Sequence, residues 1–130
     1  MIAQAKKMKL SSIAFTEHVN SYTDWFYDFQ QNIDKLRSKE EMNILIGIEA
    51  KAIDFKGTID APQDIINKAE IIVGSVHRYP DGKSKLIAID EIINLGEMKA
   101  TEIEFRLAIG LLQNNQIDVL GHPFGVYSKF

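Results

Sequence analysis

Three histidines and one glutamate occupy comparable positions along this 130-residue sequence. His18, His77 and His122 each lie at, or within two residues of, the end of a short apolar run, and Glu49 ends another such run. Imidazole nitrogens and carboxylate oxygens are the ligands that zinc, manganese and iron take from proteins. The set of His77, His122 and Glu49 matches catalytic zinc sites, which keep one coordination position for water. Any one of these residues alone would as readily be an ordinary loop residue, so the shared position of all four carries the metal hypothesis.

These side chains can act together only if the strands that carry them bring them to the same edge of a sheet. Hydrophobic periodicity predicts strands that alternate with helices. Strands are expected at 11–16, 43–48, 71–76 and 117–120, helices at 1–10, 23–37, 60–70, 89–95 and 100–114, and a turn at 79–82, with no clear pattern over 124–130. Thr23 or Asp24 is expected to cap the second helix, and Asp60 the third. Because the strands are continuous apolar runs, we expect a parallel sheet covered on both faces, with its carboxyl ends at one edge.

The composition restricts the classes of function. Hydrophobic residues make up 45% of the chain and charged residues 25%, as in ordinary folded domains. A net charge of −3 without a basic cluster gives no electrostatic case for a nucleic-acid or membrane binder. The absence of cysteine excludes disulfide scaffolds, zinc ribbons and cysteine nucleophiles. No targeting signal or membrane-spanning apolar run is found, so we expect a soluble, cytoplasmic chain.

Four short motifs, taken in order, resemble those of the PHP family, the polymerase and histidinol phosphatase superfamily of metal-dependent phosphoesterases. They are Thr-Glu-His at 16–18, Gly-Ile-Glu at 47–49, Gly-Ser-Val-His at 74–77 and Gly-His-Pro at 121–123. The resemblance extends over nearly the whole chain. It implies an α/β fold of parallel β/α units that form part of a distorted, TIM-like (β/α)7 barrel. Residues 1–130 would then be a single partial PHP-like domain.

The resemblance also implies roles for the four candidate ligands. Members of the family hold up to three divalent metal ions, often zinc, manganese or iron, at the carboxyl ends of the strands. Glu49 resembles the carboxylate that bridges two ions, His77 and His122 resemble ligands of the second of these, and His18 resembles a ligand of the third. Glu49, His77 and His122 would contribute to catalysis through a metal-activated water. The implied substrate is a phosphorylated small molecule, either a metabolite such as histidinol phosphate or a nucleotide.

Two family motifs are absent from the sequence. The opening His-x-His motif and the closing Asp-x-His motif are not found, and four predicted strands make about half of a barrel. We therefore expect exposed strand edges and apolar surface, and a homo-oligomer or a complementing chain. Two alternatives stay open: a catalytically inactive metal-binding or interaction module derived from the same fold, and a fragment of a larger PHP protein such as a DNA polymerase.

Other polar and aromatic residues are weaker candidates. Glu17 would either orient a ligating histidine or lie exposed. Arg78 could contact a phosphate, although a surface position is the better prediction. The remaining side chains are assigned ordinary roles: Asp54, Lys56 and Asp60 as solvated loop residues, and Trp25 and Phe29 as core residues.

Overall fold

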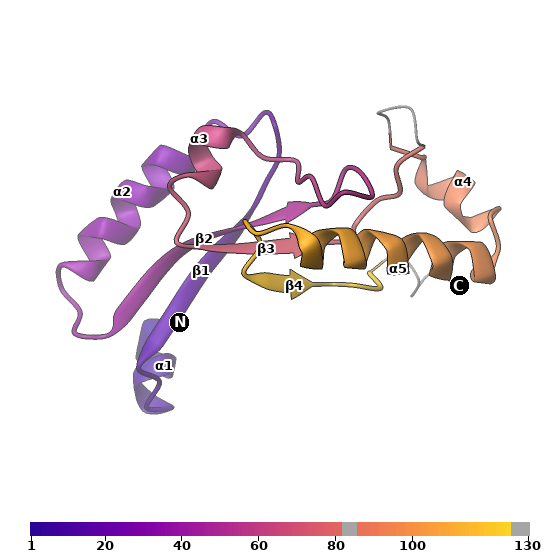
Figure 1. Ribbon diagram of the computed structural model, residues 1–130. Helices are drawn as coiled ribbons and strands as arrows, with labels where there is room; N and C mark the ends of the chain where they lie inside the picture. The colour runs from indigo at the N-terminus through magenta and orange to yellow at the C-terminus, as the bar shows by residue number, and fades with distance from the viewer. Residues whose placement is uncertain (82–85, 126–130) are drawn as a thin grey trace.

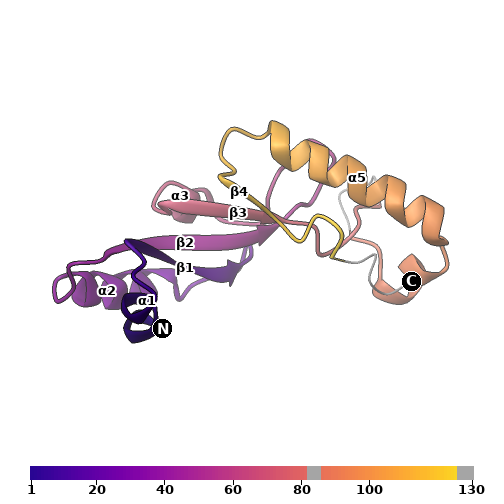
Figure 2. The ribbon, with the colours of Figure 1, turned by 90° about the horizontal axis from the view of Figure 1, so that it is seen from below.

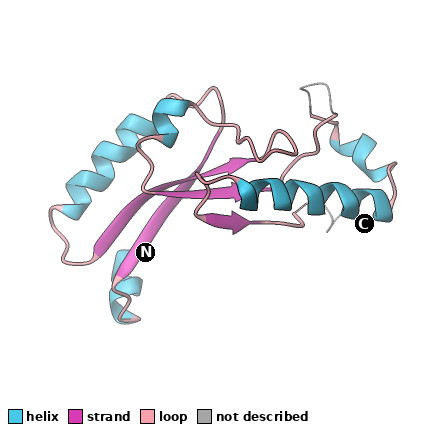
Figure 3. Cartoon of the chain, in the orientation of Figure 1, coloured by secondary structure: helices cyan, strands magenta, loops and turns pink. Residues whose placement is uncertain are grey.

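The computed structural model describes residues 1–81 and 86–125 and shows a four-stranded parallel sheet with helices between the strands (Figures 1 and 3). The strands are β1 (Ser12–Val19), β2 (Asn43–Lys51), β3 (Ile71–Ser75) and β4 (Val119–Gly121). The helices are α1 (Ile2–Lys7), α2 (Phe26–Arg37), α3 (Gln63–Ile66), α4 (Ile89–Ile93) and α5 (Glu97–Gln113). The predicted α/β class and the parallel sheet are confirmed.

The strands follow one another across the sheet in the order β1-β2-β3-β4, and each neighbouring pair is parallel. β1 and β4 therefore form the two edges, and the sheet does not close on itself within the described residues. Because all four strands run the same way, their carboxyl ends lie along one edge. The connections that contain α2, α3, and α4 with α5 return the chain to the opposite edge, as parallel strands require, whereas α1 precedes β1.

The core lies on one face of the sheet. In β2 the buried aliphatic side chains alternate, with Ile44, Ile46 and Ile48 at most 2% exposed, and they join one hydrophobic cluster with residues of α2, α3 and α5. The intervening residues of β2 face the other way, and of these Leu45 and Glu49 are not fully buried. The prediction that both faces are covered is wrong for the described part of the chain.

Helix α5 lies beside β3 and β4 (Figure 2). Its inner side includes Leu107 and Leu111, which are fully buried in the core. Its outer side carries Met98, Phe105 and Leu112, each more than half exposed. The expected exposed apolar surface is therefore present. None of the helices in residues 1–81 and 86–125 is both long and apolar enough to cross a bilayer.

The carboxyl ends of β1 and β2, which carry candidate site residues, lie further along the chain than predicted. β1 continues to Val19 and β2 to Lys51, three residues beyond the apolar runs. His18 and Glu49 therefore lie within strands and not just after them. Near their carboxyl ends, the sequences of β1 and β2 change from continuous apolar residues to an alternation of apolar and polar residues. A prediction based on unbroken apolar runs therefore ends each strand at the first polar side chain.

The starts of α2 and α3 were predicted too early. α2 begins at Phe26 after Trp25, and no side-chain cap is formed by Thr23 or Asp24. Thr23 Oγ1 instead accepts a hydrogen bond from the Asn20 amide, within the turn that leaves β1. The helix predicted at 60–70 is the four-residue α3, and Asp60 does not cap it. The other limits shift by a few residues, as helix and strand ends commonly do. The last residue of the predicted turn at 79–82 lies outside the described residues, and so do residues 126–130.

An ion pair ties the end of α2 to the start of β3. Arg37 pairs with Glu70, and its Nε donates to the Ile44 carbonyl at 2.6 Å. Glu70 Oε2 also accepts the Ile46 amide at 2.8 Å. These contacts hold α2 and the loop before β3 against the middle of β2.

This network gives an expected pH dependence of stability. The hydrogen bond from Arg37, and the Ile46 amide, lower the pKa of Glu70 from its usual 4.5, although burial opposes the shift. A carboxyl whose pKa is lower when folded stabilises the protein above its unfolded pKa, and this contribution is lost as the pH falls. Glu70→Gln should therefore lower the melting temperature at pH 7, with a difference that narrows below about pH 4.5. Thermal melts from pH 7 to 3 test this against Glu41→Gln, which alters an exposed carboxylate; a difference that stays constant with pH would contradict it.

Candidate metal centre

The sheet register brings His18 and Glu49 together. The two residues are direct partners in the β1–β2 pairing, so their side chains leave the sheet on the same face. Glu49 is in turn the partner of Val73 in β3, and Ser75 lies two residues further along the same strand face. This is the face opposite the core, at the carboxyl edge.

The Glu49 carboxylate lies at the centre of the three histidines. Nε2 of His77 is 3.3 Å from Glu49 Oε1, and Nε2 of His122 is 3.7 Å from the same oxygen. Nε2 of His18 is 3.6 Å from Oε2. The Glu49 side chain is only 12% exposed, whereas those of His18 and His122 are 71% and 62% exposed. The carboxylate is therefore held at the base of the cluster, with the imidazoles around it.

Three of the four side chains form a group compact enough to hold a metal ion. Ligand atoms of His18, Glu49 and His77 all lie within 4.8 Å of one another. The His77 ring lies between the other two, with centroids 5.5 Å from His18 and 5.3 Å from His122. His122 thus reaches the shared carboxylate from the opposite side of His77. Its backbone has φ of +43°, a left-handed conformation that is uncommon for residues with a side chain, although histidine adopts it more often than most.

The environment of His77 favours a neutral imidazole. Burial lowers the pKa of His77 from its usual 6.5. The Glu49 charge opposes this shift, while positive charge on His122, His18 and Lys51 adds to it. A metal ion binds the neutral ring, so this environment suits a ligand.

Ser75 orients the central carboxylate and was not among the predicted site residues. Its side chain is fully buried, and Oγ donates a hydrogen bond of 2.7 Å to Glu49 Oε1. The sequence holds a signal for this role, because Ser75 stands two residues before His77 and so shares its face of an extended chain.

Comparison with known proteins gives the family. A family model described as "PHP domain" matches residues 1–124. The chain belongs to the PHP family. A probable phosphatase of Caldanaerobacter subterraneus subsp. tengcongensis is 31% identical over 84 residues, 65% of this chain and 28% of that protein.

Longer alignments reach two further relatives of this PHP chain. A probable phosphatase of Clostridium botulinum (strain Langeland) is 28% identical over 93% of this chain and 44% of that protein. A probable phosphatase of Caldicellulosiruptor bescii is 26% identical over 95% of this chain and 46% of that protein. The chain therefore spans under half the length of these curated relatives.

The weaker candidates of this PHP chain differ in how deeply they are buried and in what they contact. Glu17 is exposed and is the partner of Ile48, so it faces away from Glu49. Arg78 is half-buried and donates to the Ile87 carbonyl at 3.2 Å, which differs from the predicted surface position. Phe29 packs against the core as predicted, whereas Trp25 lies at its rim, 37% exposed, with its ring edge-on to Phe29.

The loop carboxylates are also more engaged than predicted. Asp60, with a side chain 16% exposed, pairs with Lys51 and accepts the Ser21 amide at 2.9 Å. Asp54 accepts the amides of Lys56 and Thr58. Of the three loop residues predicted to be solvated, only Lys56 is exposed.

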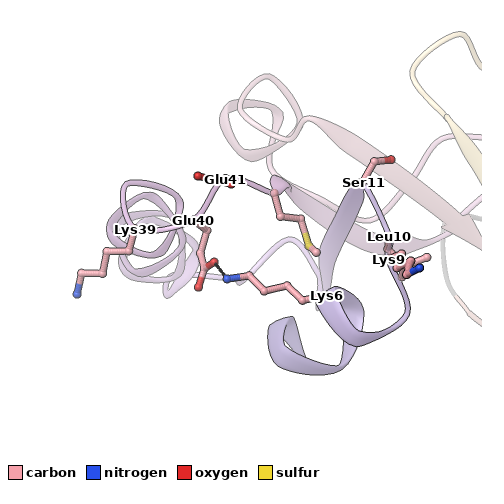
Figure 4. A pocket seen from close by; sticks show the side chains of 8 residues that line it. Lys6, Lys9, Leu10, Ser11, Lys39, Glu40 and Glu41 are labelled. Carbon is pink, nitrogen blue, oxygen red and sulfur yellow. Dashed lines mark ion pairs between the residues drawn. The ribbon is translucent and has the colours of Figure 1, made fainter.

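A separate hollow of about 710 Å³ lies away from the histidines (Figure 4). Its lining comes from the segments that precede β1 and β2, including Lys9, Ser11 and Met42. An ion pair between Lys6 and Glu40 crosses it. It lies at the amino ends of these strands, opposite the cluster of His18, Glu49 and His77.

Proposed function

We propose that this PHP chain is a metal-dependent phosphoesterase that hydrolyses the phosphate ester of a small metabolite, such as histidinol phosphate, or of a nucleotide. The observation that carries the proposal is the arrangement of three histidines around one nearly buried carboxylate. Membership of the PHP family and relatives named probable phosphatases support the same reaction class.

The donor set fits a divalent metal ion. His18, Glu49 and His77 supply two nitrogens and one oxygen within reach of one ion, and His122 offers a further nitrogen beside the shared carboxylate. Zinc, manganese and iron all accept such mixed ligands. The two carboxylate oxygens of Glu49 face different histidines, an arrangement suited to more than one ion.

The chemistry supplied at such a site is neutralisation of phosphate charge and activation of a water molecule for attack on phosphorus. The protein's own part is to fix the ligands beforehand. The Ser75 hydroxyl fixes the carboxylate of Glu49. The core behind β2 fixes the strand that carries it, and the buried setting of His77 keeps its imidazole neutral.

Metal content and hydrolysis test the proposal together. The untagged chain, purified without chelator, should contain about one or more equivalents of zinc, manganese or iron by plasma mass spectrometry, a count that rests on the three-residue cluster. It should hydrolyse an aryl phosphate in a metal-dependent reaction, and His77→Ala should abolish both properties. Metal binding without turnover in any metal would instead support the inactive metal-binding module.

Removal of the Ser75 hydroxyl should weaken metal binding without unfolding the chain. Ser75→Ala deletes the hydrogen bond to Glu49, and loss of a group that orients a ligand typically lowers metal affinity about 10- to 100-fold. Competition with a chromophoric chelator measures the affinity. Ser38→Ala is the control, because that hydroxyl donates only to the Lys35 carbonyl at the exposed end of α2. Equal affinities for the two variants would assign Ser75 a purely structural role.

A further inference from the structure

A cleft of about 680 Å³ opens at the carboxyl edge of the sheet, in a size range typical of sites for small organic ligands. Its lining comes from the segments that follow β1, β2 and β3. Ile53, Phe55 and Pro80 form apolar wall, and Tyr22 stands where the chain leaves β1. None of these residues belongs to the metal centre.

Asp60 connects the cleft to the metal centre. It lines the cleft and pairs with Lys51, which lies two residues beyond Glu49 on the same face of β2. The Lys51–Asp60 pair would therefore lie between the cleft and a phosphate bound to a metal ion at Glu49. The two sites are neighbours along one strand end, as the phosphate and alcohol parts of one ester require.

Tyr22 is exposed, yet its backbone is fixed. The side chain is 91% exposed. Its amide donates to Asn20 Oδ1 at 2.8 Å, and the preceding amide, of Ser21, donates to Asp60 at 2.9 Å. An aromatic ring on an anchored turn offers a stacking surface at low entropic cost, since the backbone need not be ordered on binding.

The described part of the cleft carries no excess of positive charge that would attract a second anionic group, since Lys51 pairs with Asp60 and Lys56 is offset by Asp54. Asp54 and Asp60 both line it. Burial raises their pKa values, but hydrogen bonds from Thr58 to Asp54, and from Lys51 and Ser21 to Asp60, outweigh it and lower both pKa values overall. Both therefore remain ionised at neutral pH. Lys56 is the one basic side chain among the described lining residues.

We propose that this cleft binds the alcohol part of the phosphate ester, and that this part carries an apolar or aromatic ring without a second phosphate. The proposal rests on the proposed function, because it assigns the phosphate to the Glu49 centre. It makes Tyr22 a specificity-determining residue that contacts the ring.

The binding of two non-hydrolysable phosphonates to the metal-loaded chain tests the role of the cleft separately from that of the metal centre. Phenylphosphonate should bind at least about ten-fold more tightly than methylphosphonate by calorimetry, because its ring is removed from water. Tyr22→Ala should lower this ratio about three- to ten-fold, and Tyr22→Phe should preserve it. Phe105→Ala, which removes an exposed ring on α5, is the matched control and should leave the ratio unchanged.

Each outcome decides between the two claims. Equal affinities for the two phosphonates, or an unchanged ratio in Tyr22→Ala, would overturn the cleft assignment and leave the phosphoesterase proposal standing. A Tyr22-dependent preference for the phenyl compound, without hydrolysis of any ester, would support the cleft and refute the reaction. Absence of binding by both phosphonates would overturn both claims.

Discussion

Glu49→Gln is expected to reduce both metal binding and the proposed phosphatase activity by more than about 100-fold, since it changes a proposed ligand and not merely a group that orients one. The amide has the same shape as the carboxylate but lacks its charge. It also offers one oxygen, where the carboxylate presents Oε1 to His77 and His122 and Oε2 to His18. Metal content by mass spectrometry and hydrolysis of an aryl phosphate give the two readouts.

Glu17→Gln is the matched control for that experiment. Glu17 is the neighbour of His18 in β1, but it is exposed on the other face of the sheet. The same change of charge at almost the same place should therefore leave both readouts within about two-fold of the wild type, as expected of a surface substitution. If both variants lost metal equally, general electrostatics and not coordination by Glu49 would explain the result.

Gly57→Ala is expected to destabilise the fold by about 3 kcal/mol or more, from steric overlap and backbone strain combined. Gly57 has φ of +82°, and a Cβ added there would overlap the carbonyl of Gly110 in α5. The approach is mutual, because a Cβ on Gly110 would lie 2.6 Å from the Phe55 carbonyl oxygen. The urea midpoint should fall markedly.

Gly96→Ala separates strain from overlap. Gly96 has a similar φ of +77°, but a Cβ there would meet no atom within 4 Å. With ψ of 156° its backbone lies in a region essentially restricted to glycine, so the substitution should cost only this backbone strain, about 1 to 3 kcal/mol. The difference between the two variants measures how closely α5 packs on the loop after β2; equal losses would show that this contact yields readily.

The order of elements and the parallel sheet were accessible from sequence, because each strand core is an unbroken apolar run. The ends of β1 and β2 were not, since residues such as Glu17 and Lys51 continue the strands with polar side chains. The role of Asp60 was also inaccessible. Its position before Pro62 favoured a helix cap, but the tertiary fold brings it to Lys51 and to the Ser21 amide.

The four candidate ligands were found from their place at strand ends, and the structure gathers the three histidines around Glu49. The prediction grouped Glu49 with His77 and His122 and assigned His18 to a different ion. In the structure the compact group is His18, Glu49 and His77. The register of β1 against β2 makes His18 a direct partner of Glu49, and apolar runs carry no information about register. Ser75 was missed for a related reason, because a hydroxyl acquires its role only once β2 and β3 are aligned.

That alignment also links the site to the folding of the sheet. A slip of β1 by one residue would turn His18 to the core face and leave Glu17 opposite Glu49, placing two carboxylates where an imidazole and a carboxylate should meet. An ion that requires both His18 and Glu49 can bind only the correctly aligned sheet, and its binding free energy adds to the stability of that alignment alone. Metal binding would thus favour the correct register of β1 and β2 over misaligned pairings as the protein folds.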